Sequence, residues 1–328
     1  MGEKHTDSRD FYRTRYQGVE DLPGVGPAIA TMLAGGGWKT VQSLATAMAS
    51  ELSKIGIGEE TAKKIITAAR KSLEIKFIKG DELVKLRKET TQMTTGCPSL
   101  DRLLEGGLDT KSITEFYGEF GSGKSQVCQQ LAITVQLPVE KGGLDGACLY
   151  LDTESVFRPE RVTQIATGMG LDGNAVLKRI IYAEAFTSEH QEVLLGNCED
   201  VIKDNGVRLI IVDSLMAHYR SEYLGRETLA PRQQNVNKFL HKLKRLSQAF
   251  NAVAVVTNQV VSTPDSTYGV VAPKPIGGHV VGHAVHSRIY LRKGRENLRI
   301  AKIVASPFLP EGEAPFRITA EGIVGDDL

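Results

Sequence analysis

Cysteine is scarce in this sequence and never occurs in a metal-binding pattern. The four cysteines, Cys97, Cys128, Cys148 and Cys198, are separated from one another by 20 residues or more. Without a CxxC pair or a Cys/His cluster, a structural zinc site is not expected. We expect four buried, reduced thiols instead.

Long apolar runs are also absent. No stretch approaches the roughly 20 apolar residues that cross a bilayer, and Met1–Asp7 lacks the apolar core of a signal peptide. These absences predict a cytoplasmic protein without a membrane partner. The formal net charge of +1 neither favours nor excludes nucleic acid as a ligand. A length of 328 residues favours more than one domain.

Four segments of different composition follow one another along the chain. Residues 1–18 are polar and are expected to form a flexible tail. Residues 19–73 are rich in Ala, Leu and Ile with glycine-containing turns, which predicts a small all-helical domain. A charged linker, 74–95, leads to residues 96–328, where predicted strands alternate with helices. This alternation predicts an α/β domain with a mostly parallel central sheet.

Apolar runs and turn residues define the expected elements of the α/β domain. Strands are predicted at 112–117, 147–152, 208–213 and 253–258, with a final hairpin at 286–292 and 298–304. Helices are predicted to follow Ser125, Pro159, Ser188 and Pro231. The stretches 218–232 and 260–283 show no such pattern and are expected to be long functional loops.

A glycine-rich motif separates the first of these strands from the helix after it. Its residues are Gly118, Glu119, Phe120, Gly121, Ser122, Gly123, Lys124 and Ser125, followed by Gln126. The pattern is G-x-x-x-x-G-K-[ST], in which backbone N–H groups turn inward around phosphate oxygens. The positive N-terminal end of the next helix adds to the attraction. We expect ATP here, with Lys124 at the β- and γ-phosphates and Ser125 on Mg²⁺.

Polar residues follow three other predicted strands. Asp213 ends an apolar run and is expected to share the Mg²⁺ site with the motif serine. Glu154 and Asp152 are both candidates to activate a water for hydrolysis, and their spacing alone leaves both open. Asn258 and Gln259 are placed to touch a γ-phosphate, although a polar pair that merely ends a strand fits equally well.

The helical segment contains a motif typical of contacts with the DNA backbone. Leu22–Ala30 resembles a helix-hairpin-helix, in which Gly24 and Gly26 expose backbone N–H groups to a phosphate. Ile55–Gly58 resembles a second, degenerate copy. Such elements bind DNA without reading its sequence. A tight turn between packed helices is the alternative interpretation.

Both expected long loops leave the sheet edge that carries the nucleotide motifs. The first contains Arg220, Arg226 and Arg232, and the second contains Gly277 and Gly278 among several prolines. Loops joined to residues that contact a γ-phosphate can couple the ATP state to a polymer ligand. We therefore interpret both as DNA-facing loops.

Taken together, these motifs resemble the archaeal RadA recombinases of the RecA-type strand-exchange family. The resemblance covers nearly all of residues 20–325. Besides the phosphate loop, its most specific segments are Leu151–Glu154, Phe157–Arg161, Tyr223–Arg226, Thr257–Val260, Pro275–His279 and Leu309–Ala314. It implies a RecA-type P-loop ATPase core preceded by a helix-hairpin-helix domain. The implied activity is ATP-dependent homologous pairing and strand exchange in DNA repair.

The resemblance also implies roles for single residues of the nucleotide site. It assigns water activation to Glu154, stacking on adenine to Arg161, and γ-phosphate sensing to Gln259 and His283. Pro307, in a segment that ends the sheet hairpin, would cover the nucleotide held by the next subunit.

Self-association and DNA are the partners that the resemblance implies. Subunits would form a helical filament or ring, with ATP between neighbours, on single-stranded DNA that is paired with double-stranded DNA. Phe77 and Gly80 fall in a linker segment that relatives use to dock on the next subunit. Recombination mediators are implied as further partners.

Three residues depart from the pattern of these relatives. Gly80 stands where Ala is usual, Ser155 replaces the more common Gly, and Ala305 stands where relatives usually have Asp. A carboxylate at that last position could approach a γ-phosphate only through a cation, because like charges repel strongly at short range. Since Ala305 offers no such ligand, the sequence predicts weak dependence on potassium.

Other functions fit parts of this pattern. A recombinase paralogue would act as a DNA-binding ATPase mediator without exchanging strands, but paralogues generally lack the helical domain or have shortened loops. A hexameric helicase of RecA fold would not need Phe77. A non-enzymatic DNA-binding module would not need Lys124, Asp213 and Glu154 together. The recombinase accounts for all the motifs.

Overall fold

The computed structural model divides the chain into two compact units, Met1–Thr90 and Thr91–Leu328. It describes residues 16, 18–72, 80, 84, 90–261 and 274–325. The division between the units falls within the charged segment 74–95. Among the described residues, no helix is long and apolar enough to cross a membrane.

The first unit is a group of short helices around an apolar core. Its elements are the 3₁₀ turn η2 (Val19–Asp21), α1 (Pro27–Gly35), α2 (Val41–Ala45), α3 (Ala49–Lys54) and α4 (Glu59–Ser72). Leu33, Leu52 and Ile65 are completely buried between them. The turns before α1 and α4 contain Gly24 and Gly56, whose φ angles of 90° and 91° favour glycine. The two turns thus repeat the same backbone geometry.

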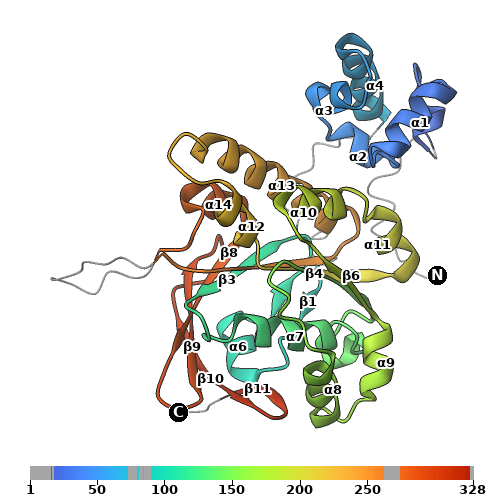
Figure 1. The fold of residues 1–328 in the computed structure, drawn as a ribbon. Helices are drawn as coiled ribbons and strands as arrows, with labels where there is room; N and C mark the ends of the chain where they lie inside the picture. The colour runs from blue at the N-terminus through green and yellow to red at the C-terminus, as the bar shows by residue number, and fades with distance from the viewer. Residues whose placement is uncertain are drawn as a thin grey trace, which may run out of the picture. The chain divides into compact units, whose positions relative to one another are not determined.

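The second unit is built on a nine-stranded sheet (Figure 1). Its strands are β3 (Ile113–Gly118), β4 (Ala147–Asp152), β5 (Ile180–Glu184), β6 (Val207–Asp213), β7 (Val253–Asn258), β8 (Ser287–Lys293), β9 (Leu298–Ala305), β10 (Glu313–Thr319) and β11 (Gly322–Gly325). They lie in the order β11-β10-β9-β8-β3-β7-β6-β4-β5. Neighbours from β8 to β5 are parallel, and those from β8 to β11 are antiparallel. A separate antiparallel pair joins β1 (Gln92–Met93) to β2 (Leu108–Asp109).

Helices cover both faces of this sheet (Figure 1). On one face lie α6 (Pro98–Leu103), α7 (Lys124–Thr134), α8 (Pro159–Gly168) and α9 (Gly173–Lys178), with the short turn η3 (Val139–Lys141) after α7. On the other lie α10 (Ser188–Gly196), α11 (Glu199–Asn205), α12 (Ala217–Glu222), α13 (Leu229–Ala249) and α14 (Gly278–Ala284). Successive residues of each central strand therefore enter different cores: Ile211 packs with α7, whereas Val212 packs with α13.

The predicted α/β fold class is confirmed: a mostly parallel sheet covered by helices, and a small helical N-terminal unit. Strands β4 and β7 have the predicted ends, β3 and β8 are shifted by one residue at both ends, and β6 and β9 differ by one residue at one end. Strands β5, β10 and β11 were not predicted. They lie at the two margins of the sheet, where β5 and β10, unlike the central strands, are only partly buried.

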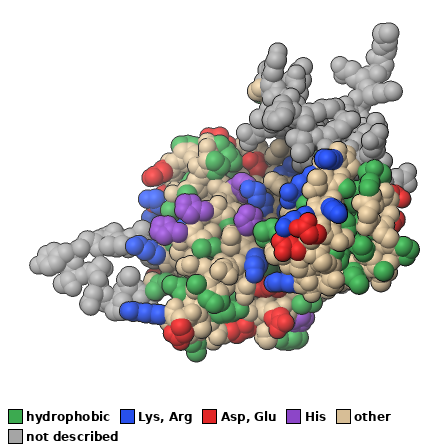
Figure 2. All heavy atoms as spheres, turned by 90° about the horizontal axis from the view of Figure 1, so that it is seen from above, with side chains coloured by type: hydrophobic (Ala, Val, Ile, Leu, Met, Phe, Trp, Pro, Cys, Tyr) green, Lys and Arg blue, Asp and Glu red, His purple; other side chains and the backbone are tan. Residues whose placement is uncertain are grey.

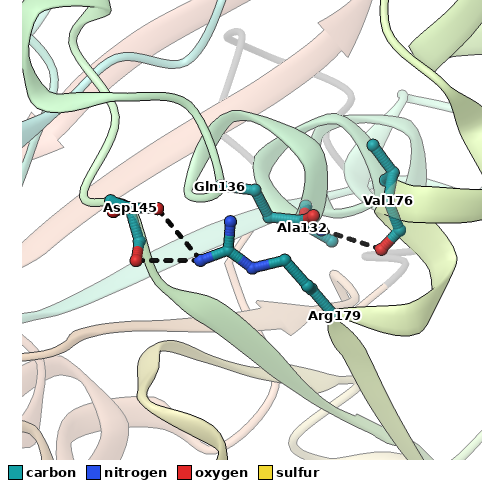
Figure 3. Close-up of polar contacts among 5 residues, drawn as sticks. All are labelled: Ala132, Gln136, Asp145, Val176 and Arg179. Carbon is teal, nitrogen blue, oxygen red and sulfur yellow. Dashed lines mark hydrogen bonds and ion pairs between the residues drawn. The ribbon is translucent and has the colours of Figure 1, made fainter.

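Polar side chains anchor the edge strand β5 (Figure 3). Arg179, which directly precedes β5, donates to the carbonyl oxygen of Asp145 at 2.9 Å and to its carboxylate at 3.2 Å. The Gln136 amide donates to the carbonyl oxygens of Ala132 and Val176, at 2.8 and 3.1 Å. Because Ala132 belongs to α7 and Val176 to α9, this amide joins the two helices that lead into β4 and β5.

The prediction of two long loops is wrong in part, because both stretches contain helices. Within 218–232, α12 and the start of α13 leave only 223–228 between them. Within 260–283, Val260 forms a β-bridge with Pro275 and α14 begins at Gly278, while 262–273 lie outside the described residues. Glycine lowers the helix propensity of α14, and packing of the buried Val281 compensates for it.

All four cysteines are free and buried, as predicted. Burial raises the pKa of the Cys198 thiol to about 12. Since the thiolate is the reactive form, such a thiol is a poor nucleophile at neutral pH. The cysteines therefore act as small apolar side chains of the core.

Candidate functional site

The carboxyl ends of four parallel strands meet at one edge of the sheet. Strand β3 runs into the phosphate loop, β4 leads to Glu154, β6 ends at Asp213 and β7 leads to Gln259. Asp152 and Asp213 are direct register partners on neighbouring strands. Ligands of open α/β sheets bind at this edge. The topology therefore brings the predicted nucleotide-site residues of β3, β4, β6 and β7 to one place.

The phosphate loop has a backbone that only its glycines allow. Gly121 and Gly123 have left-handed φ angles of 75° and 103°. Gly118 lies so close to β8 that an added Cβ atom would come within 2.1 Å of the Leu291 carbonyl oxygen. Helix α7 begins at Lys124, so its first turn presents unpaired N–H groups next to the loop.

Two polar side chains of the loop fit an anionic ligand. The Lys124 ammonium donates to the carbonyl oxygens of Gly118 and Glu119, both at 2.9 Å. Burial lowers the pKa of Lys124, whereas the charges of Asp213 and Glu154 raise it. The hydroxyl of Ser122, in the same loop, is buried without a hydrogen-bond partner. A phosphate group of ATP could accept hydrogen bonds from both side chains and would give the Ser122 hydroxyl the partner it lacks.

The Asp213 carboxylate lies next to the Ser125 hydroxyl. It is 2% exposed and accepts hydrogen bonds from Thr257 at 2.5 Å, from Tyr150 at 2.8 Å and from Ser125. Burial raises the pKa of Asp213, and these three hydrogen bonds lower it. An oxygen pair of this kind fits Mg²⁺, which takes few protein ligands and keeps several waters.

The geometry distinguishes Glu154 from Asp152. Both carboxylate oxygens of the buried Asp152 accept backbone N–H bonds, from Glu154 at 3.0 Å and Phe157 at 2.9 Å, so this side chain closes the turn after β4. Glu154 is exposed, and its carboxylate accepts from the Ser214 hydroxyl at 2.6 Å and the Gln259 amide at 3.2 Å. Only Glu154 has a carboxylate that solvent can reach.

The polar pair at the end of β7 has two different environments. Asn258 is completely buried, and its amide donates to Glu115 at 2.8 Å and to the Ile276 carbonyl oxygen at 2.6 Å. Gln259 is half-buried and directs its amide to Glu154. The interpretation that both residues touch a phosphate is therefore wrong for Asn258.

Arg161 lies beside the start of α7. Its guanidinium donates to the carbonyl oxygens of Thr319 and Ala320, both at 2.7 Å, and to the Gln126 side chain at 2.9 Å. Gln126 directly follows the phosphate loop. Arg161 is thus held between the nucleotide loop and the β10–β11 turn, next to the loop where a contact with adenine was predicted.

Pro307 and His283 are not joined to the phosphate loop by any hydrogen bond among the described residues. Pro307 is exposed just after β9, whose last residue, Ala305, pairs with Arg288 near the start of β8. Since β8 is parallel to β3, this is the end of the sheet opposite the phosphate loop. His283 is exposed on α14.

His283 lines a cavity of about 290 Å³ between α13 and α14, together with His241 and Lys244. Its ring stacks on that of His279, with centroids 6.0 Å apart. Figure 2, which looks onto this end of the second unit, shows histidine side chains gathered beside Lys and Arg. The two helices thus present a group of basic side chains on one face.

Two protein-family models match the chain. The Rad51 model matches residues 86–326, which is more than half of the chain and includes the phosphate loop, Glu154 and Gln259. The chain belongs to the Rad51 family. Its members are RecA-type, DNA-dependent ATPases of recombination and repair that bind ATP with Mg²⁺. A model described as a SAM-like helix-hairpin-helix tandem matches residues 16–71, which supports DNA binding.

The predicted DNA contacts of this Rad51-family chain lie on helices and their ends. Arg220 on α12 and Arg226 in the following turn are exposed, and Arg232 in the first turn of α13 is half-buried. None of the three forms an ion pair with another described residue, so their charges can face a phosphate. Gly277 and Gly278, with φ angles of 93° and 55°, form the turn that starts α14.

The two helix-hairpin-helix turns share their geometry but differ in charge. Helix α1, after Gly26, has no acidic residue in its first turn. Helix α4 begins with Glu59 and Glu60, which pair with Lys63 at 2.8 and 3.3 Å. Carboxylates at a helix N-terminus oppose the approach of a phosphate. The turn with Gly24 and Gly26 is therefore the better phosphate site.

Two basic residues beside the phosphate loop were not predicted. The Arg299 guanidinium donates to the Gly121 carbonyl oxygen at 3.2 Å. The Lys293 ammonium lies 3.1 Å from where a Cβ atom on Gly121 would stand. No motif marks these residues. The pairing of β8 with β3 brings Lys293 to the loop, and the pairing of β9 with β8 brings Arg299 there.

Ser155 has the backbone conformation of a glycine. Its φ angle of 53° lies in the left-handed region that favours glycine. We expect Ser155→Gly to stabilise the ATPase unit by about 0.5–1 kcal/mol, which raises Tm by roughly 1–4 °C. The exposed hydrogen bond from Ser155 to Glu184 is lost in this variant and offsets little of the gain.

Thermal unfolding measures this effect, and Ser221→Gly is the matched control. Ser221 lies in α12, where glycine is expected to lower Tm. A decrease in Tm for Ser155→Gly similar to that of the control would contradict the strain at Ser155.

Proposed function

We propose that this Rad51-family chain is an ATP-dependent recombinase of the archaeal RadA type. It would assemble on single-stranded DNA and exchange that strand with homologous duplex DNA. The observation that carries the proposal is the 3.2 Å hydrogen bond between Gln259 and Glu154, at the sheet edge to which the phosphate loop also belongs. It joins Glu154, which is suited to activate water, to Gln259, which stands at the start of a segment expected to face DNA.

Residues from several strands would share the work of hydrolysis. Lys124 and the loop N–H groups bind and orient the phosphates. Glu154 accepts the proton of the attacking water, and the Gln259 amide orients the Glu154 carboxylate. Ser125 and Asp213 are the residues that would hold Mg²⁺, which supplies charge neutralisation when bound.

Assembly of several copies would complete the site. Pro307 lies at the end of the sheet opposite its own phosphate loop, so Pro307 could cover only the nucleotide of another copy. Among the described residues β5 is the last strand of the sheet; it contains the exposed Tyr182 and is followed by the exposed Phe186, which suits the addition of a strand from a neighbour. Phe77, outside the described residues, and the exposed Gly80 are the proposed docking segment. Mediator proteins would act on this assembly.

Arg226→Ala is expected to weaken DNA binding almost equally for all sequences. Arg226 is exposed, and a recombinase must tolerate any base sequence, so the contact is expected to be with phosphate. The slope of log K against log salt concentration should fall by about 1. Titration of several oligonucleotides at two salt concentrations tests this, with Lys141→Ala, an exposed cation in η3 on the other face of the sheet, as the control. A loss confined to one base composition would contradict the phosphate contact.

Ala305→Asp is expected to create a potassium requirement that the unmodified protein lacks. Ala305 is exposed near Pro307, and a carboxylate there could face a γ-phosphate only through a cation. ATP hydrolysis with DNA should be compared in potassium and in sodium at equal ionic strength, because salt also weakens DNA binding. A strong preference of the unmodified protein for potassium would show that carbonyl groups or Glu311 already supply the ligand.

The alternative function is that of a DNA-binding ATPase mediator, and a strand-exchange assay separates the two. Purified protein is incubated with single-stranded DNA, homologous duplex and ATP in the absence of any other recombinase. Formation of the exchanged duplex supports the recombinase. ATP hydrolysis and DNA binding without exchange would support the mediator.

A further inference from the structure

A buried polar network runs from β8 through β3 to the end of β7. The Arg288 guanidinium pairs with Glu115 at 2.6 Å, and the Glu115 side chain has no exposed surface. The other carboxylate oxygen of Glu115 accepts from the Asn258 amide at 2.8 Å. A buried charge is strongly unfavourable unless it is paired and hydrogen-bonded, so these three side chains depend on one another.

Asn258 also binds the backbone on both sides of segment 262–273. Its amide donates to the Ile276 carbonyl oxygen at 2.6 Å, and its side-chain oxygen accepts from the Gln259 N–H at 2.9 Å. Beyond it, the Ile276 N–H donates to the Gln259 carbonyl oxygen and the Val261 N–H to the Lys274 carbonyl oxygen, both at 2.9 Å. We call these paired residues, 259–261 and 274–276, the stem.

Asn258 holds the N–H of Gln259, and Ile276 of the stem holds its carbonyl group, so the Gln259 backbone is fixed on both sides. Only the side chain of Gln259 remains to turn, and its amide points to Glu154. The polar network is not needed to hold the sheet, because β3, β7 and β8 are already joined by their ladders. Apolar side chains can replace a buried ion pair without loss of packing. The polar network instead fixes the position of the stem.

We propose that Asn258, anchored on the Glu115–Arg288 pair, is a positioning residue that holds Gln259 against Glu154. The inference rests on the proposed function, because it assigns Glu154 and Gln259 to hydrolysis. Asn258 is completely buried and binds only protein groups, so it acts through Gln259. Misplacement of a catalytic group by about 1 Å can cost roughly 100-fold in rate. Loss of Asn258 therefore lowers the rate of hydrolysis and not the affinity for ATP.

The test compares Asn258→Ala with Ser287→Ala. Ser287 is buried in β8 beside Arg288 and contacts Ser306 at 3.2 Å, so its loss removes a buried polar contact outside the network. Asn258→Ala should lower kcat at least about tenfold with KM for ATP changed less than about twofold. In the same variant, hydrogen exchange should show loss of protection at the amides of Val261 and Ile276. Ser287→Ala should retain the kcat of the unmodified protein and the protection of these two amides.

If Asn258→Ala does not fold, Asn258→Ser replaces it in the test, because serine keeps one hydrogen-bond donor. The loss of kcat and of exchange protection should then be smaller but in the same direction. An unchanged kcat in Asn258→Ala, or an equal loss in Ser287→Ala, overturns the proposal. If the unmodified chain hydrolyses no ATP with DNA present, the proposed function is wrong. Exchange at the amides of Val261 and Ile276 then still decides whether Asn258 holds the stem.

Discussion

Replacement of Lys124 by alanine is expected to abolish ATP hydrolysis, with a loss of at least about 100-fold. Lys124 is the basic side chain at the start of α7, and its ammonium already lies against the carbonyl groups of Gly118 and Glu119. Alanine keeps the backbone N–H groups of the loop but removes the charge that opposes developing negative charge on the phosphates. Steady-state hydrolysis with single-stranded DNA measures the effect.

Lys203→Ala, on α11, is the control for loss of a lysine elsewhere on the ATPase unit. It should hydrolyse ATP at the rate of the unmodified protein. Equal rates for Lys124→Ala and the unmodified protein would rule out the phosphate loop as the nucleotide site.

Glu154→Gln is expected to lower kcat by roughly 100- to 10,000-fold while ATP still binds. Glutamine has the size of glutamate, and its carbonyl oxygen can still accept from Ser214 and Gln259. The change therefore removes the base and leaves the arrangement around it. Single-turnover hydrolysis and binding of a fluorescent ATP analogue separate the two effects.

Glu160→Gln provides the matched control, because Glu160 is an exposed glutamate on α8 after the same strand. It should behave as the unmodified protein does. Rapid hydrolysis by Glu154→Gln would show that a group other than Glu154 acts as the base. The buried Asp152, with both oxygens bound to backbone N–H groups, is a poor substitute.

Central strands and the phosphate loop could be predicted because their signals are local. Strands β4 and β7 are short apolar runs buried on both faces, and their ends match the prediction. The phosphate loop depends on glycines at fixed spacing, and Gly121 and Gly123 have the left-handed angles that this spacing implies. The meeting of Glu154, Asp213 and Gln259 followed from parallel topology.

The parts that could not be predicted depend on tertiary contacts. Helix α14 contains glycines and histidines and is stabilised by packing on α13, which no local pattern reveals. The different environments of Asn258 and Gln259 could not be predicted, because they depend on contacts with Glu115 and Arg288. These two residues lie more than 100 residues apart in the sequence. Arg299 reaches the phosphate loop only because β9 follows β8 in the sheet.

Electron microscopy of the protein with single-stranded DNA and a non-hydrolysable ATP analogue tests the central proposal most directly. The recombinase account predicts helical filaments that require both ligands and that Lys124→Ala fails to form. Closed rings on the DNA, or single copies bound along it under the same conditions, would contradict the account.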